Sequence, residues 1–102
     1  MESIFKALAD KNRRRMLDQL FEQDGQTLGE LCGRFSMSRQ AGSKHLKILE
    51  QAGLITVHWA GREKRHYLNP LPIQDISERW IAKFHRERAA AVSALKNALE
   101  DD

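Results

Sequence analysis

The chain contains 102 residues, of which 41% are hydrophobic and 30% charged, and its net charge is +3. This composition excludes a disordered chain and predicts a single domain over residues 1–102, with a modest positive excess. No apolar run approaches the roughly twenty residues that a membrane helix needs, and the one cysteine allows no internal disulfide. We therefore expect a cytoplasmic protein that has no membrane partner.

Two amphipathic helices are predicted at the start of the chain. The first covers Glu2 to Ala9, and the second follows its N-cap Asp10 and runs to about Gln23. The apolar residues of the second helix are Met16, Leu17, Leu20 and Phe21. Residues 13–15 are arginines in its first turn, where cations oppose the helix dipole. The carboxylates expected to offset this cost, in preference to DNA phosphate, are those of Asp10, Asp18 and residues 100–102.

A helix-turn-helix is predicted from Thr27 onward. Residues 27–30 have the capping-box pattern, in which the Thr27 hydroxyl accepts from the Glu30 amide and the glutamate accepts from the Thr27 amide. Ser38 is the expected N-cap of the second helix, Arg39 to Gln51, which Gly53 ends. The residues of this second helix predicted to face a core are Ala41, His45, Ile48, Leu49 and Ala52.

Several small residues stand inside these two helices. Cys32 is expected to be a buried core residue, and a redox switch is the alternative. Three glycines are interpreted as allowing the helices to approach closely, at a cost in helix propensity. They are Gly29, Gly33 and Gly42.

The exposed face of residues 39–51 carries Arg, Gln, Ser and Lys, and no acidic residue occurs before Glu50. Such a face suits a DNA major groove, because Arg and Lys bond guanine, Gln bonds adenine, and Ser bonds bases or phosphates. The alternative is a solvated helix face, but those usually mix Glu with Lys. The predicted major-groove residues are Ser38, Arg39, Gln40, Ser43, Lys44, His45 and Lys47.

A β-hairpin is predicted next, with strands at residues 54–59 and 65–68 and a turn at residues 60–63. Its basic tip suits a minor groove or phosphates. Between Ser36 and Tyr67, six Lys or Arg stand against two Glu, for a sum of +4, whereas the other residues sum to −1. This asymmetry is typical of a nucleic-acid surface. The predicted wing contacts are Arg62, Lys64, Arg65 and Tyr67.

The last predicted element is one continuous helix, because residues 73–99 contain neither Pro nor Gly. At roughly 40 Å it would be longer than a domain of this size can cover. A second copy of the chain is the simplest partner for it, so residues from about 72 to 100 are assigned to dimerisation. The alternative is a helix that folds back over its own domain or stays exposed. The predicted dimer interface is Ile4, Phe5, Leu8, Ile76, Trp80, Phe84, Val92, Leu95 and Leu99.

Neither catalysis nor metal binding is indicated by the remaining residues. No nucleophile has a base at a recognisable spacing, and no glycine loop could cradle a phosphate, so we expect neither an enzyme nor a cofactor. His58 and His66 are expected to face each other across the hairpin, but no carboxylate or thiolate is placed to complete a metal site. His45 is interpreted as a capping or phosphate-contacting side chain.

The chain resembles the arsenic-repressor (ArsR/SmtB) family of bacterial winged-helix transcriptional regulators. The segments that carry the resemblance span nearly the whole chain; they are Phe5 to Asp10, Arg13 to Leu17, Leu28 to Leu31, Ser43 to Leu49, Ala52 to Ile55, and Gly61 to Tyr67. The resemblance implies a mainly helical winged helix-turn-helix with a small hairpin, of α-α-α-α-β-β-α type. It also implies a homodimer, joined through the first and last helices, that represses transcription at an operator and is released by an inducer.

The metal sites of that family are missing from this sequence. Arsenic and cadmium sensors carry Cys-x-Cys on the third helix, and here Arg34 follows Cys32 in place of the second cysteine. Zinc sensors place Asp-x-His and a distant His-x-x-Glu on the last helix. Here Ser77 replaces the first histidine, and Arg88 and Ala91 stand where the distant pair would be. The last helix resembles the metal-independent branch, whose members often accompany small-ligand-binding proteins.

The predicted function is therefore a dimeric repressor that binds double-stranded DNA at an inverted-repeat operator. Two-fold symmetry would place the recognition helices about 34 Å apart, one DNA turn. One alternative is a winged-helix module that binds protein or dimerises without a DNA role. Another is a metal sensor whose site differs from the family pattern.

Overall fold

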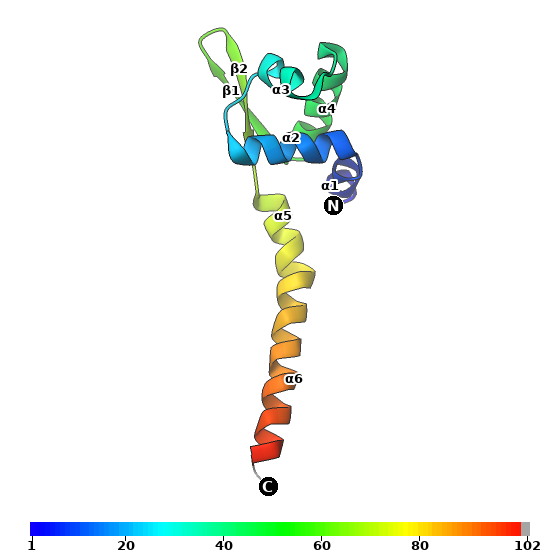
Figure 1. Ribbon diagram of the computed structural model, residues 1–102, viewed down its shortest axis with the longest axis vertical. Coiled ribbons are helices and arrows are strands. Elements are labelled where there is room, and N and C mark those ends of the chain that lie inside the picture. Colours follow the sequence, from blue (N-terminus) through cyan, green and yellow to red (C-terminus); the bar gives the residue numbers. More distant parts are fainter. Residues whose placement is uncertain (101–102) are drawn as a thin grey trace. The chain divides into compact units, whose positions relative to one another are not determined.

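The computed structural model describes residues 1–100, which divide into two compact units: Met1–Pro72, and a second that begins at Ile73. The element order follows the predicted succession of four helices, a hairpin and a terminal helical segment (Figure 1). The elements are α1 (Glu2–Leu8), α2 (Lys11–Glu22), α3 (Leu28–Phe35), α4 (Arg39–Gln51), β1 (Ile55–Ala60), β2 (Glu63–Leu68), α5 (Leu71–Ile76), the π-helical turn η1 (Ser77–Ile81) and α6 (Ala82–Glu100). The chain is thus mainly helical with a two-stranded antiparallel hairpin, as predicted. No helix within residues 1–100 combines the length and the apolarity needed to cross a bilayer.

One hydrophobic core holds the first unit together. Its buried residues come from α1 to α4 and from the start of β1: Ala7, Met16, Leu17, Leu20, Leu31, Leu46, Leu49, Ala52, Leu54 and Ile55. The inner face of α4 centres on Gly42, Leu46 and Leu49. Leu46 was not predicted to be buried, because helical spacing placed this face about one residue away, on Ala41, His45 and Ile48, which are half-buried.

Phe21 does not belong to this core, contrary to prediction. It lies in the last turn of α2, and 80% of its surface is exposed. The buried face of α2 is made by Met16, Leu17 and Leu20 alone. Helical spacing aligned Phe21 with that face, but the core ends one residue earlier.

Each predicted N-cap is confirmed. Asp10 Oδ1 accepts from the amides of Asn12 at 2.8 Å and Arg13 at 3.1 Å. Thr27 Oγ1 accepts from the Glu30 amide at 3.2 Å, and Ser38 Oγ from the Ala41 amide at 3.1 Å. The capping box differs in one detail, because the Glu30 carboxylate accepts from the Thr27 hydroxyl rather than from its amide.

The arginines at the start of α2 find partners that the sequence analysis did not consider. Arg13 Nε donates to the Ala7 carbonyl at 2.8 Å, and Arg13 Nη2 donates to that of Lys6 at 3.1 Å. Arg14 Nη1 donates to the Leu8 carbonyl at 2.8 Å. These carbonyls belong to the last turn of α1, the negative end of the helix, and that of Lys6 also accepts from the Ala9 amide at 3.3 Å. Carbonyl oxygens thus share this compensation with Asp10, whose pKa the charge of Arg13 helps to lower. Residues 101–102 of the predicted acidic set lie outside the described part.

Helices α3 and α4 approach most closely at Gly42. A Cβ atom added there would lie 2.4 Å from Cys32 Sγ and 3.1 Å from Leu28 Cδ1. At Gly33 such an atom would have no neighbour within 4 Å. The close-approach interpretation therefore holds for Gly42, and the structure offers no reason for the glycine at position 33.

The hairpin pairs Ile55 with Leu68 and Ala60 with Glu63 around a two-residue turn, in which Gly61 adopts a φ of +63°. In this register His66 stands opposite Val57, and His58 opposite Arg65. Successive side chains on a strand point to opposite faces, so the two histidines lie on different sides of the hairpin. The prediction that they face each other is wrong.

The second unit is helical throughout its described residues, and one turn departs from α geometry. In the π-helical turn Ser77–Ile81, the Ala82 amide donates to the Ser77 carbonyl, five residues back. No residue of α6 is buried. Its large apolar side chains are more than half exposed, with Phe84 at 55%, Val92 and Leu95 at 62% and Leu99 at 67%.

Candidate nucleic-acid interface

The exposed face of α4 carries six of the seven residues predicted to enter a major groove. Ser38 caps the helix, and the side chains that follow it on this face are exposed to solvent: Arg39, Gln40, Ser43, Lys44 and Lys47. Their spacing of one, four, five and eight residues from Arg39 keeps them on one side of a helix. Glu50 is the first carboxylate on the helix, so its N-terminal two turns present cations and amide or hydroxyl groups alone.

His45 departs from this predicted set. Its ring is half-buried, and Nδ1 lies 3.3 Å from Arg13 Nη1 and 4.0 Å from Asp10 Oδ1. The Arg13 amide lowers the pKa of Asp10 most, and the Asn12 amide and the charges of Arg13 and His45 add to this, while burial opposes it. His45 therefore lies at the junction of α4 with the start of α2, and its DNA contact stays a prediction.

The four predicted wing residues divide into two groups. Arg62 and Lys64 are exposed at the hairpin tip. Arg65 is held by the protein: Nη1 donates to the Gly25 carbonyl at 2.7 Å, and Nη2 donates to Glu63 Oε2 at 2.6 Å. Arg65 Nη1 also lies 3.9 Å from Glu30 Oε1. These bonds fasten the hairpin to the turn before α3, so Arg65 positions the wing and the structure gives no support to its predicted DNA contact.

Tyr67 likewise lies away from the tip. It is half-buried near the base of the hairpin, where its ring meets His58 edge-on at 5.3 Å. A Cβ atom at Gly25 would come within 3.2 Å of that ring, and Gly25 has a φ of +77°. The ring therefore packs on the turn between α2 and α3, and its role as a wing contact stays a prediction.

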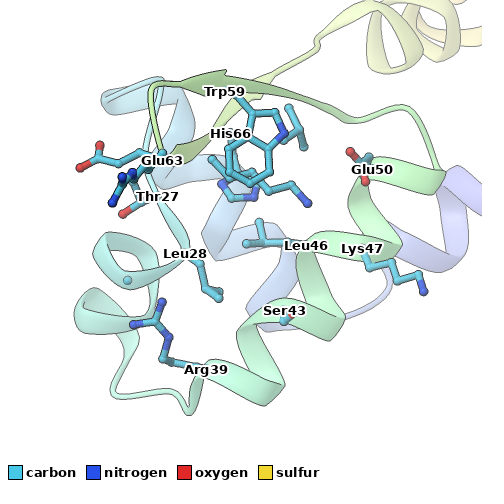
Figure 2. A pocket seen from close by; sticks show the side chains of 14 residues that line it. Thr27, Leu28, Arg39, Ser43, Leu46, Lys47, Glu50, Trp59, Glu63 and His66 are labelled. Atoms are coloured by element: carbon cyan, nitrogen blue, oxygen red, sulfur yellow. The ribbon is translucent and has the colours of Figure 1, made fainter.

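A groove of about 750 Å³ separates the recognition face of α4 from the hairpin. Figure 2 shows Arg39, Ser43 and Lys47 on the α4 side and the Trp59 ring extending from the hairpin above Leu46. The other cations that line the groove are Arg62 and Lys64. Trp59 was not among the predicted site residues, although its alternation with Ile55 and Val57 along β1 places it on their face.

The buried residue Gln26 connects the hairpin to helices α2 and α3. The Gln26 side chain donates to the carbonyls of Gln19 at 3.1 Å and Gln23 at 2.8 Å, and accepts from Arg34 Nε at 2.9 Å. Its backbone carbonyl accepts from the His66 amide at 2.9 Å and lies 2.9 Å from His66 Nδ1. This residue therefore joins the end of α2, α3 and β2. Its role was missed because nothing in the sequence marks a glutamine as buried.

Two residues of α3, Cys32 and Arg34, stand where the family's arsenic and cadmium sensors have their Cys-x-Cys pair. Arg34, which replaces the second cysteine, donates through its two terminal nitrogens to Gln19 Oε1 at 3.0 Å and Gln23 Oε1 at 2.9 Å. Cys32 is 5% exposed, as expected for a core residue, and its Sγ lies 3.7 Å from the Ser38 carbonyl. Within residues 1–100, no three His, Cys, Asp or Glu side chains gather closely enough to hold a metal ion.

A capped helix with a cationic exposed face, preceded by a packed helix and followed by a hairpin with a basic tip, defines a winged helix-turn-helix DNA-binding protein. Residues 8–58 match a family model described as a helix-turn-helix domain. The transcriptional regulator YuzN of Bacillus subtilis (strain 168), itself uncharacterised, is 41% identical over 86 residues, which cover 78% of this chain and 94% of YuzN. The transcriptional repressor SdpR of the same organism is 38% identical over 84 residues, covering 82% of this chain and 91% of SdpR.

The fold comparison points the same way. A crystal structure of an ArsR family transcriptional regulator superposes with a TM-score of 0.71 and 32% identity, covering 86% of this chain and 89% of the other. The chain belongs to the ArsR family of helix-turn-helix transcriptional regulators. This family is not enzymatic, which confirms the prediction that the chain is not an enzyme.

Proposed function

We propose that the protein is a dimeric repressor that binds an inverted-repeat operator. The observation that carries the proposal is the exposed face of α4, where Arg39, Gln40, Ser43 and Lys44 are accessible and no carboxylate precedes Glu50. Among its relatives, SdpR is a transcriptional repressor. An ordinary solvated helix would pair such cations with glutamates on the same face.

In this proposal the two parts of the site act differently. The N-terminal half of α4 enters the major groove, where Arg39 can bond guanine and Gln40 can bond adenine with two hydrogen bonds. The wing tip, with Arg62 and Lys64, meets phosphates or the adjacent minor groove and fixes the orientation of the helix. Base contacts then set the sequence preference, and phosphate contacts set the affinity and its dependence on salt.

Dimerisation is supported by the apolar side chains of the second unit. Phe84, Val92 and Leu95 are each more than half exposed, and burying such side chains stabilises a complex by about 25 cal/mol per Å². Ile4 and Leu8 of α1 already pack against the core of the first unit, so the long helix would supply most of the proposed surface. Two-fold symmetry predicts half-sites about 34 Å apart, one turn of DNA.

Regulation by the family's metal sites is not part of the proposal. Arg34 stands at the sequence position of the second cysteine, and its guanidinium donates to three glutamine side chains, those of Gln19, Gln23 and Gln26. A thiolate site built on Cys32 would need further sulfur ligands for a soft metal.

The test is fluorescence anisotropy with the DNA upstream of the protein's own gene and with random duplex, each at several salt concentrations. We expect tighter binding to one fragment, an affinity that falls as salt rises, and one dimer per site by analytical ultracentrifugation. Absence of any salt-dependent binding would favour an interaction module without a DNA role. A particle of 11.8 kDa in solution would refute the dimer.

A further inference from the structure

The hairpin forms one wall of the groove, and this wall contains the exposed side chain of Trp59 together with the cations Arg62 and Lys64. Ile55 is in the core, Val57 is half-buried, and Trp59, the next side chain on this face of β1, is 68% exposed. Lys64 stands opposite Trp59 in the hairpin register and lines the same groove. The hairpin thus continues its inner face beyond the core and presents a large aromatic surface toward α4 (Figure 2).

The facing wall and the floor complete the groove. Arg39, Ser43 and Lys47 of α4 line one side, and Leu46, which is 5% exposed, lies on the floor. Four cations therefore line the groove against two carboxylates, those of Glu50 and Glu63. Because Glu63 Oε2 accepts from Arg65 at 2.6 Å, its charge is compensated within the wing, and the groove keeps a positive excess.

We infer that this groove holds one sugar–phosphate strand of the operator, with Trp59 packed against a deoxyribose and with Lys47 and Lys64 on the phosphates beside it. The inference rests on the proposed operator binding. If α4 lies in the major groove and the wing tip reaches the neighbouring minor groove, the strand that separates those grooves passes between α4 and the hairpin.

The chemistry of the groove matches that occupant. A DNA strand alternates anionic phosphates with sugar faces that are largely apolar, and here an aromatic ring lines the groove together with Lys64 on its own wall and Lys47 on the facing wall. Trp59 would then contribute apolar contact without neutralising a phosphate, whereas each lysine would release counterions. The salt dependence of binding therefore distinguishes the role of Trp59 from that of the lysines.

The experiment measures binding of Trp59→Ala, Trp59→Phe and Lys64→Ala to the promoter fragment and to random duplex, at four salt concentrations. Trp59→Ala should weaken binding to both duplexes about tenfold and leave the slope of log K against log salt unchanged. Trp59→Phe should keep most of the affinity, because the ring remains. Lys64→Ala should lower the slope by about one.

Phe21→Ala is the matched control, since Phe21 is an exposed aromatic residue that does not line the groove. It should bind DNA as the wild type does. A second readout is the ¹⁹F NMR spectrum of protein labelled with 5-fluorotryptophan, in which the resonance missing from Trp59→Phe should shift when promoter DNA is added.

The possible outcomes separate the inference from the proposed function. If the wild type binds DNA with a salt dependence but Trp59→Ala binds equally well and the resonance does not move, the inference is wrong and operator binding stands. A lowered melting temperature of Trp59→Ala would assign the ring a structural role and also overturn it. If the wild type binds no duplex, the proposed function fails and takes the inference with it.

Discussion

The contact between α3 and α4 at Gly42 allows a stability prediction with a defined partner. In Gly42→Ala the new methyl group would lie 2.4 Å from Cys32 Sγ, whereas nonbonded heavy atoms settle at roughly 3.5–4.0 Å. Overpacking of this kind costs about 1–3 kcal/mol, and the better helix propensity of alanine returns up to about 1 kcal/mol. We expect a net loss of about 1–2 kcal/mol of unfolding free energy.

Removing the sulfur should remove the penalty. In a Cys32→Ala background the nearest remaining atom is Leu28 Cδ1 at 3.1 Å, the end of a flexible side chain. Gly42→Ala should therefore be close to neutral in that background, with a favourable coupling of about 1–2 kcal/mol between the two sites.

The assay is urea unfolding followed by far-UV circular dichroism on the wild type, the two single variants and the double variant. All four are measured at one protein concentration, since the stability of the proposed dimer would depend on it. Gly33→Ala is the control, because nothing lies within 4 Å of its added methyl group, and it should stabilise α3 slightly. Equal costs for Gly42→Ala with and without the sulfur would refute the packing argument.

Four further predictions concern the site and its support. Arg65→Ala should weaken DNA binding with an unchanged salt slope, because Arg65 positions the wing, whereas Arg62→Ala should lower that slope by about one in the same anisotropy titration. Gln40→Ala should cost about 1–3 kcal/mol on the operator and little on random duplex. Gln26→Leu should lower the unfolding free energy by about 1–3 kcal/mol in urea, since it removes the three part-buried hydrogen bonds of the Gln26 side chain. The folded state lowers the pKa of Asp10, so its contribution is present above its ordinary value of 3.8 and is lost as pH falls through the lower folded-state value. The stability gap between wild type and Asp10→Ala, about 1 kcal/mol at neutral pH, should therefore close only below pH 3.8.

Each of these has a contrary result. A lowered salt slope in Arg65→Ala would return that residue to the phosphate contacts. Equal loss from Gln40→Ala on operator and random duplex would remove it from base recognition. An unchanged stability of Gln26→Leu would mean that water replaces its partners, and a gap for Asp10→Ala that closes above pH 4 would contradict the direction of the shift.

Local features of this fold were predictable because their causes lie within a few residues. Asp10, Thr27 and Ser38 cap helices through bonds that span two or three positions, and Gly53 ends α4 with a φ of +77°. The exposed face of α4 follows from spacing alone. These signals are sufficient for the order of elements and for the exposed side chains of α4.

The contacts of Arg65 and His45 were not predictable, because their partners are distant in sequence. Arg65 bonds Gly25, 40 positions earlier, and His45 lies beside Arg13, 32 positions earlier. A basic side chain on a hairpin has the same pattern whether it faces DNA or a backbone carbonyl, so composition cannot distinguish Arg65 from Arg62. The position of Trp59 depended on where the core ends, which requires the packed structure.

The π-helical turn at Ser77–Ile81 changes the phase of the terminal helix. Successive residues of an α-helix are rotated by about 100° about the helix axis. The π-helical turn contains one extra residue, so the side chains after it are rotated relative to those before it. A regular α-helix that binds here can pack against the apolar side chains after this turn, such as Phe84 and Leu95, or against those before it, such as Ile73. It cannot match both, so the turn marks where knobs-into-holes packing must break.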